Sequence, residues 1–373
     1  MIYLDNAATT KPFDEVIDTM ADVMKNHWGN PSSPYELGDD ARRIIESVRE
    51  QISEDINCES EEIIFTSGAC EANTLAIVGY GKKHPIANCM STYIEHASIH
   101  KTYARKFWNN DEQGFVTIYK HLLDKKEFYA DVQKFASISA ANGEIGTIQD
   151  IKTLSYNLHS LNYIFHTDAT QLYPERRIDV KDLGIDMMSV SAQKFNGPKG
   201  VGFLYVRKGI EISPVIYGSQ ENGLRGGTYD TAAIAGMGKA LEITRRLQKI
   251  GSVAYTEELR NRLLDQLMKV PGVTLNGPEV GLNRLANNIN ITIDGVNAER
   301  LVTLCSLHGI YIGKGSACQS YEPTPSHVLK AIGLTDEQAF NTIRITLSAQ
   351  NTEEEIDPAA EIIIKLIKRI RGE

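Results

Sequence analysis

The chain has 373 residues, of which 42% are hydrophobic, so it is long enough to form two packed domains with full cores. A formal net charge of −9 at pH 7 argues against the basic surface that nucleic-acid binding requires, and we expect no nucleic-acid partner. The start Met-Ile-Tyr-Leu lacks the basic and apolar regions of a signal peptide, and no stretch approaches the length of a membrane span. We therefore expect a cytoplasmic protein without a membrane partner.

Short apolar segments alternate with longer amphipathic segments through the first 250 residues. The strand-like segments are 61–65, 87–92, 134–139, 163–166, 187–191 and 202–206. These strand-like segments lie between helix-like segments such as 39–56, and a long helix is predicted over 231–247. This alternation predicts an α/β fold with a mostly parallel central sheet and helices on both faces.

The sequence after residue 250 has its own pattern. An apolar periodicity over 253–267 and a Pro-Gly turn at 271–272 precede an alternating strand at 288–292. Thr352 and Glu355 form the signature of a capping box before a helix at 356–370, which has an apolar stripe and a basic last turn. We expect a large domain over 15–250 and a smaller α/β domain made of 1–14 and 251–373.

Cysteine and histidine spacing indicates neither disulfides nor a metal site. The five cysteines include no C-x-x-C pair, and the nine histidines are scattered along the chain. We expect reduced thiols and no metal.

A tight glycine turn joins the strand-like run that ends at Thr66 to a helix that begins near Ala69. Such a helix start offers backbone N–H groups to an anion, although an ordinary strand-to-helix connection has the same appearance. The segment matches neither G-x-G-x-x-G nor a Walker loop, so a dinucleotide or a nucleoside triphosphate is not favoured.

Polar residues follow two later strands. Asp168 and Gln171 stand at the predicted carboxyl end of one strand, where open α/β sheets bind ligands, although Asp168 could equally cap a helix. Lys194 follows the next strand directly, whereas Lys199 lies in a Gly-Pro turn. A lysine beside a buried strand is suited to form a Schiff base, because desolvation lowers the pKa of its amine.

Cys318 lies in a segment whose glycines and prolines interrupt regular structure, namely Gly313, Gly315, Pro323 and Pro325. A thiol on such a loop could act as a nucleophile, while most free cysteines are small buried apolar residues. An anion site, a strand-end aspartate and a buried lysine together describe a pocket for pyridoxal 5′-phosphate.

The motifs along nearly the whole chain resemble the cysteine desulfurase family, in the group whose catalytic cysteine lies on a long mobile loop. The matching segments are Asp5-Asn-Ala-Ala-Thr-Thr, Gly29-Asn-Pro-Ser-Ser, Thr66-Ser-Gly-Ala, Glu95-His, 142–149, His166-Thr-Asp-Ala-Thr-Gln, Lys194, Gly197-Pro-Lys-Gly, Leu224-Arg-Gly-Gly-Thr, Ala286-Asn-Asn and Gly315-Ser-Ala-Cys. The resemblance implies a fold-type I pyridoxal phosphate-dependent transferase that forms a homodimer.

The resemblance also implies roles at the cofactor. Lys194 would hold its aldehyde, His96 would stack on the ring and move protons, and Asp168 would pair with the ring nitrogen. The remaining cofactor contacts would come from Ala69, Cys70, Gln171, Ser191, Gln193 and, from a second subunit, Thr228.

For the substrate, the resemblance implies that Arg344 and Asn142 bind L-cysteine and that Cys318 takes its sulfur as a persulfide. The expected product is L-alanine, and the sulfur would pass to an acceptor protein for iron–sulfur cluster assembly or for thiolation of tRNA or a cofactor. The alternatives are a selenocysteine lyase or another β-lyase, and a non-catalytic sulfur-relay paralogue.

Three pocket positions differ from the family pattern. Cys70 replaces a hydroxyl residue, Gln193 a histidine and Gly143 an asparagine. Because cysteine is a weak donor and glycine has no side chain, we expect altered cofactor affinity, which asparagine at position 143 should restore.

Overall fold

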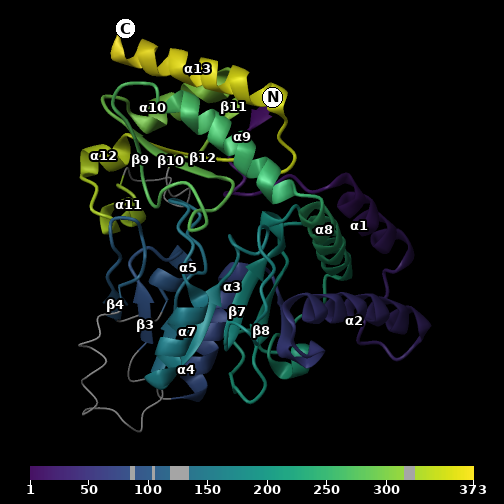
Figure 1. Ribbon diagram of the computed structural model, residues 1–373. Helices are drawn as coiled ribbons and strands as arrows, with labels where there is room; N and C mark the ends of the chain where they lie inside the picture. Colours follow the sequence, from purple (N-terminus) through teal and green to yellow (C-terminus); the bar gives the residue numbers. More distant parts are fainter. Residues whose placement is uncertain (85–88, 103–105, 118–133, 315–323) are drawn as a thin grey trace.

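The computed structural model describes residues 1–84, 89–102, 106–117, 134–314 and 324–373. Its central sheet has seven strands in the order β2-β8-β7-β6-β5-β3-β4 (Figure 1). These strands are β2 (Ile63–Thr66), β3 (Cys89–Thr92), β4 (Lys106–Trp108), β5 (Lys134–Ser137), β6 (Tyr163–Asp168), β7 (Met187–Ser191) and β8 (Gly202–Val206). Neighbouring strands from β4 to β7 pair in parallel, and β8 runs antiparallel to both β7 and β2.

Side chains of each strand alternate between two apolar layers. Phe203 and Tyr205 of β8 pack in the layer beneath α2 and α8, while Leu204 and Val206 pack in the opposite layer. Helices cover both faces of the sheet: α1 (Asp14–Asn26), α2 (Glu36–Ile56), α3 (Ala69–Thr74), α4 (Tyr80–Lys83), α5 (Ala97–His100), α7 (Ile151–Ser160) and α8 (Thr231–Lys249). The predicted α/β class with a mostly parallel sheet is therefore confirmed.

The carboxyl-terminal part of the chain forms a second, smaller sheet. Its strands have the order β12-β10-β9 and pair antiparallel. The elements of this region are α9 (Ser252–Leu267), β9 (Val273–Leu275), β10 (Asn288–Ile293), α10 (Ala298–Leu307), β11 (Ile310–Tyr311), α11 (His327–Ala331), α12 (Asp336–Phe340), β12 (Thr342–Thr346) and α13 (Glu353–Arg371). The predicted capping box joins Thr352 and Glu355 at the start of α13.

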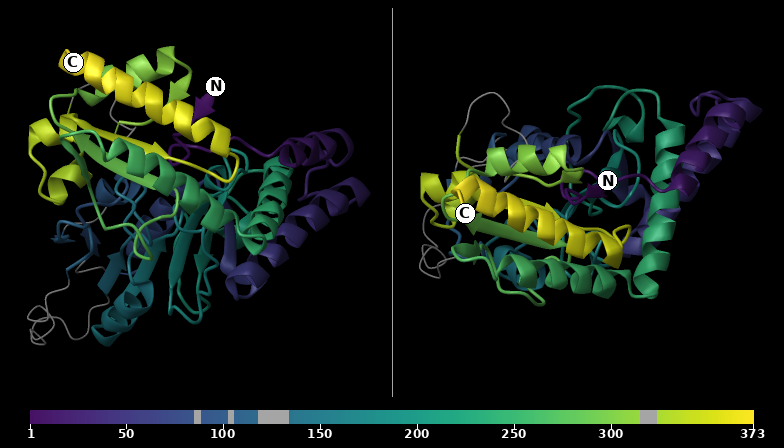
Figure 2. Two further views of the ribbon diagram at one scale, coloured as in Figure 1. Left: turned by 45° about the horizontal axis from the view of Figure 1, so that its top comes forward. Right: turned by 90° about the horizontal axis from the view of Figure 1, so that it is seen from above.

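The two faces of this smaller sheet differ in chemistry. Ile343 and Ile345 of β12 pack in an apolar cluster with α9 and α13, which lie along the sheet in both views of Figure 2. Arg344 points to the opposite face, because side chains alternate along a strand. That face meets the loop after β5, where Asn290 Nδ2 donates to Glu144 O at 3.0 Å.

The amino terminus belongs to the same region. β1 (Ile2–Tyr3) pairs in parallel with β11, and Leu4 packs in the apolar cluster of the smaller sheet. The following residues cross to the central sheet, where Thr10 N donates to Gln193 O at 2.9 Å. Division of the chain into 15–250 and 1–14 with 251–373 stays a prediction. Within the described residues, no helix is long and apolar enough to cross a bilayer.

Candidate active site

A cavity of about 350 Å³ lies between the carboxyl ends of the central strands and the polar face of the smaller sheet. Most of the predicted site residues line it: Ala69, Cys70, His96, Asn142, Asp168, Gln171, Ser191, Gln193, Lys194 and Arg344. The fold therefore brings residues from distant parts of the chain to one place. Thr228 does not line the cavity, and Cys318 lies outside the described residues.

The predicted anion-binding turn forms one end of the cavity. Gly68 has a φ of 138°, a conformation that residues with a Cβ rarely adopt, and α3 begins at the next residue. The first turn of α3 then presents backbone N–H groups at Ala69 and Cys70. Ser191, the last residue of β7, is adjacent, since its Oγ would lie 3.4 Å from a Cβ placed on Gly68.

Asp168 ends β6 and is nearly buried. Its Oδ2 accepts a hydrogen bond from Asn73 Nδ2 at 2.8 Å, and its Oδ1 accepts one from Thr170 N at 3.0 Å. The following residues form turns, so Asp168 is not the N-cap of a regular helix. The carboxylate is thus held at the cavity by two donors.

Lys194 follows β7 on a short 3₁₀ turn and lines the cavity. Its Nζ donates to Ala7 O at 2.6 Å and to Ala8 O at 2.7 Å. The residue is half-buried and is thus less buried than the sequence predicted, because the amine faces the cavity. Lys199 is exposed and does not line the cavity, which distinguishes the two lysines.

His96 caps α5 and lines the cavity. Solvent reaches the ring through the cavity, but protein surrounds its other sides, and this burial lowers the pKa of His96 although Asp168 acts to raise it. The preceding Glu95 is 1% exposed and accepts hydrogen bonds from Thr92 Oγ1 at 2.7 Å and from Ser139 N at 3.0 Å. Burial outweighs these donors and raises the pKa of Glu95 to about 7.

Arg344 enters the cavity from the smaller sheet. Its Nη2 donates to Asp5 Oδ1 at 2.7 Å and its Nη1 to Gly143 O at 3.4 Å, while the buried Nε has no hydrogen-bond partner among the residues that the structure describes. A guanidinium with a donor to spare fits a carboxylate ligand. Gly313, five positions before Cys318, is bridged to the backbone of Arg344, with N···O distances of 2.8 and 2.9 Å.

Asn142 lines the cavity, but its side chain is already engaged with the backbone. Its Oδ1 accepts from Glu144 N at 2.8 Å and from Ile145 N at 3.0 Å, and its Nδ2 donates to Ile94 O at 2.8 Å. These bonds shape the loop that carries Gly143. The predicted contact of Asn142 with substrate stays a prediction.

Thr228 is exposed on a loop beside the cavity. Arg225, three residues before it, pairs through Nε with Glu71 Oε1 at 2.8 Å, and Glu71 lines the cavity. The loop is therefore anchored beside the site, while Thr228 itself is exposed and does not line the cavity.

Several residues in or beside the cavity were not predicted as site residues from the sequence. Asp5 pairs with Arg344, and the carbonyls of Ala7 and Ala8 hold Lys194, all within the Asp5-Asn-Ala-Ala motif that carried part of the resemblance. His327 also lines the cavity, and its Nε2 lies 2.9 Å from Glu95 O. The motif was the available signal for the first three, whereas no local pattern indicated His327.

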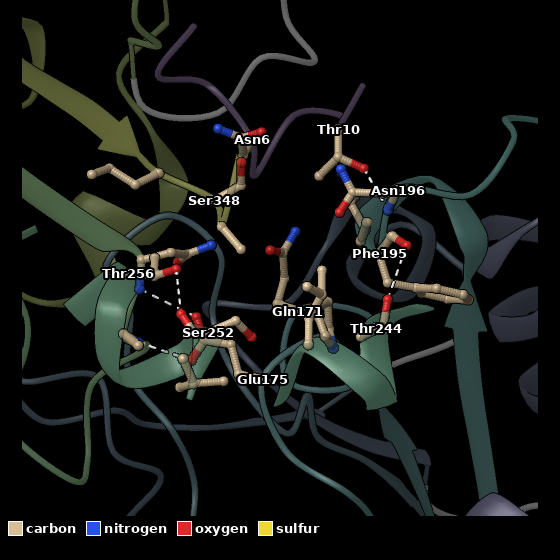
Figure 3. A pocket seen from close by; sticks show the side chains of 18 of the residues that line it. Asn6, Thr10, Gln171, Glu175, Phe195, Asn196, Thr244, Ser252, Thr256 and Ser348 are labelled. Carbon is tan, nitrogen blue, oxygen red and sulfur yellow. Dashed lines mark hydrogen bonds between the residues drawn. The ribbon is translucent and has the colours of Figure 1, made fainter. Parts of the chain in front are cut away.

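A second, smaller cavity of about 70 Å³ lies behind the first, between α8, α9 and the loop after β6 (Figure 3). Gln171 and Lys194 line both cavities. Glu175 accepts hydrogen bonds there from Ala286 N at 2.8 Å and from Asn287 N at 3.2 Å, which joins the two halves of the chain.

The donor set of the larger cavity fits pyridoxal phosphate. Backbone N–H groups and a hydroxyl suit a phosphate, the carboxylate of Asp168 suits a protonated ring nitrogen, and the amine of Lys194 suits an aldehyde. The fold and the cavity thus define a fold-type I pyridoxal phosphate enzyme.

Comparisons with known proteins give the family. The aminotransferase class-V description matches residues 2–358. Cysteine desulfurase IscS of Clostridium botulinum (strain Kyoto / Type A2) is 39% identical over 382 residues, covering 99% of this chain and 95% of that protein. A solved NifS-like protein superposes with a TM-score of 0.89 at 30% identity, covering 99% of both chains. SspA in complex with cysteine superposes with a TM-score of 0.78 at 30% identity, covering 94% of this chain and 100% of that one.

The chain belongs to the aminotransferase class-V family, and within it to the pyridoxal phosphate-dependent cysteine desulfurases.

Proposed function

We propose that this cavity converts L-cysteine to L-alanine and that Cys318 receives the sulfur as a persulfide. The observation that carries the proposal is the meeting of Lys194, Asp168 and His96 with Arg344, whose buried Nε has no hydrogen-bond partner in the described part of the chain. SspA, a similar solved structure, holds cysteine, which supports cysteine as the substrate.

Binding of the substrate carboxylate is assigned to Arg344. Asp5 fixes one side of its guanidinium at 2.7 Å, so the remaining donors are oriented before the substrate arrives. A preoriented fork loses little conformational freedom on binding. The carboxylate position in turn sets the direction of the substrate side chain.

Holding of the cofactor is assigned to Lys194, Asp168, Ser191 and the first turn of α3. Pyridoxal phosphate, when bound, supplies an electron sink that makes the substrate α-hydrogen acidic. Lys194 Nζ would take that proton, because it lines the cavity and the carbonyls of Ala7 and Ala8 hold it there. His96, which also lines the cavity, would exchange protons with the substrate.

Sulfur transfer is assigned to Cys318, which lies outside the described residues. Its thiolate would attack the sulfur of cysteine, forming an S–S bond as the substrate C–S bond breaks. The electron pair of the broken bond stays on the substrate carbon, where a proton completes the methyl group of alanine. The products are alanine and a persulfide, so no further oxidant or reductant is consumed.

The roles of Gln171, Gln193, Asn142 and Cys70 follow from their places at the cavity and remain part of the proposal. Other thiols are poor candidates for the nucleophile. Burial raises the pKa of Cys58, Cys89 and Cys305 to about 12, so little thiolate forms near neutral pH.

A homodimer is part of the proposal. Thr228 is exposed and does not reach the cavity of its own chain, in agreement with a contact to the site of a second subunit. Tyr217, earlier on the same loop, is 76% exposed, and Trp28 is 69% exposed. Large aromatic surfaces of this kind are typical of protein interfaces. The sulfur acceptor is proposed to be a scaffold or thiolation protein.

Incubation of the full chain with L-cysteine tests the proposal. We expect alanine, and mass spectrometry should find one added sulfur on the peptide that holds Cys318. Cys318→Ser should bind the cofactor yet form no alanine, whereas Cys58→Ser, Cys89→Ser and Cys305→Ser should stay active.

Other outcomes separate the alternatives. Free sulfide with pyruvate and ammonia, and neither alanine nor a persulfide, would indicate a β-lyase, and turnover restricted to selenocysteine would indicate a selenocysteine lyase. Cofactor binding without any turnover would indicate a sulfur-relay paralogue. An added sulfur on Cys70 alone, with Cys318→Ser still active, would show that Cys70 is the nucleophile in place of Cys318.

A further inference from the structure

Two cofactor-facing groups are joined by an uninterrupted set of hydrogen bonds. Asn73 Nδ2 donates to Asp168 Oδ2 at 2.8 Å and to Ser98 Oγ at 2.9 Å. Ser98 Oγ lies 2.8 Å from His96 Nδ1, and the backbone N of Ser98 donates to the same nitrogen at 3.2 Å. Asn73 is fully buried on α3, and Ser98 is on α5. Neither residue touches the cavity.

The direction of each bond is determined by its partners. Asp168 can only accept while ionised, so the amide nitrogen of Asn73, rather than its oxygen, must face it. The second hydrogen of that nitrogen goes to Ser98 Oγ, which leaves the serine hydrogen for His96 Nδ1. Because Ser98 N also donates to Nδ1, the imidazole hydrogen must reside on Nε2.

We propose that Asn73 and Ser98 are positioning residues that hold His96 as the neutral tautomer with its hydrogen on Nε2, the ring nitrogen left available to the cavity. The inference rests on the proposed function, since it gives His96 and Asp168 the roles assigned there. It adds that the hydrogen bonds of Asn73 and Ser98 orient Asp168 and His96 together. We call Asn73 and Ser98 the bridge. Protonation of Nδ1 would place its hydrogen against the hydrogen of Ser98 N–H, so the bridge disfavours the imidazolium form of His96.

The groups that act electrostatically on His96 come from several elements. Asp168 of β6 favours the charged ring, whereas Lys194 after β7 and His327 of α11 disfavour it. Glu95 directs its carboxylate away from the ring, to Thr92 and Ser139. Loss of the Ser98 hydroxyl removes a donor to neutral Nδ1 and changes none of these charges, so its effect is separable from theirs.

The test is a ¹H–¹⁵N NMR titration of the histidines in the full chain, with cofactor bound and after its removal. His96→Gln identifies the His96 signals. In the unsubstituted protein, we expect an unprotonated Nδ1 and a protonated Nε2 near neutral pH. Ser98→Ala should raise the pKa of His96 by about 0.5 to 1, the equivalent of one neutral hydrogen bond, and Ser98→Thr should restore it.

Controls address folding and the proposed function. Ser160→Ala makes the same chemical change on the exposed end of α7 and should leave the His96 signals unchanged. Asn73→Ala should shift the His96 titration less in the Ser98→Ala protein than in the unsubstituted one, because the two residues act through one path. Strictly additive shifts would contradict the bridge.

A hydrogen on Nδ1 of the unsubstituted protein, or an unchanged His96 titration in Ser98→Ala, would overturn the proposal. Alanine formation is measured in parallel on the same samples. Absence of alanine with the expected NMR shifts would refute the function and leave the bridge standing, whereas normal alanine formation without these shifts would do the reverse.

Discussion

The cavity has two sides that the chain builds differently. We call Ala69, Asp168, Ser191 and Lys194 the cofactor wall; each stands at the end of a central strand or on the turn that follows. We use the name substrate wall for Gly143 and Arg344, which line the cavity, together with Asp5 and Gly313, which contact Arg344. Its contacts join positions 339 and 201 residues apart.

The cofactor wall follows from local sequence patterns, whereas the substrate wall does not. In a mostly parallel sheet, most strands end at one edge. Residues at the strand ends therefore lie close together, whatever the sequence of the connecting loops. The substrate wall depends on a crossing of the amino terminus between the two sheets, which short-range patterns do not contain. Substitutions on the cofactor wall should therefore impair cofactor attachment, whereas substitutions on the substrate wall should impair turnover of cysteine.

The largest expected effect is on the cofactor wall. Lys194→Ala should abolish covalent attachment of the cofactor and lower the rate of alanine formation by about 10²- to 10⁴-fold, because the proton-transferring amine is lost. Borohydride reduction followed by peptide mass spectrometry measures the attachment. Lys199→Ala is the matched control, since this lysine is exposed and outside the cavity. Cofactor found on Lys199 would contradict the assignment.

A change on the substrate wall should spare the cofactor. Arg344→Lys keeps the charge but loses the fork, so kcat/KM for cysteine should fall by about 10- to 100-fold with the absorbance of bound cofactor retained. Asp5→Asn should have a smaller effect in the same direction, because the guanidinium loses its fixed partner.

Arg262→Lys is the control for this substitution, as its pairing with Asp357 is exposed and remote from the cavity. Loss of cofactor absorbance in Arg344→Lys would show that the two walls are not separable.

Glu95 supports the cofactor wall and should make stability depend on pH. Its pKa is about 7 in the fold and about 4.3 in an unfolded chain, so the folded protein holds the proton longer as pH rises. Glu95 therefore lowers the free energy of unfolding as the pH rises from about 4.5 to 7, by on the order of 1–3 kcal/mol.

Glu95→Gln should remove that part of the pH dependence. Denaturant unfolding of both proteins at pH 5 and pH 7.5 measures it, with Glu361→Gln on exposed α13 surface as control. Parallel pH dependences for the two proteins would refute the raised pKa.

The smallest effect is expected where the walls meet. A Cβ on Gly143 would lie 2.6 Å from Gln171 Cδ, so a side chain there displaces Gln171 from its 3.2 Å bond to Ala7 O. The sequence alone predicts tighter cofactor binding in Gly143→Asn. The structure instead predicts weaker binding, by about 0.5–1.5 kcal/mol.

Cofactor titration of Gly143→Asn, Gln171→Ala and the double variant checks this. The effect of Gly143→Asn should shrink once Gln171 is truncated. An unchanged or improved affinity in the single variant would restore the expectation from the sequence.

Much of the fold could be predicted because its signals are local. The helix predicted at 231–247 is α8, Thr231–Lys249, and the predicted capping box at Thr352 is present. β4 was missed because its three residues carry no clear alternation. The burial of Lys194 was overestimated because a residue beside an apolar strand can still face a cavity.

Strand periodicity and turn chemistry act over a few residues, so the α/β class, the strand-end positions of Asp168 and Lys194, and the motifs that indicated the family could be recognised without coordinates. The contact of Asp5 with Arg344, the place of Gln171 beside Gly143, and the path from Asp168 through Asn73 and Ser98 to His96 became visible in the folded chain. These contacts arise where separately folded segments pack, and side-chain geometry across such a boundary is set by the packing of both partners.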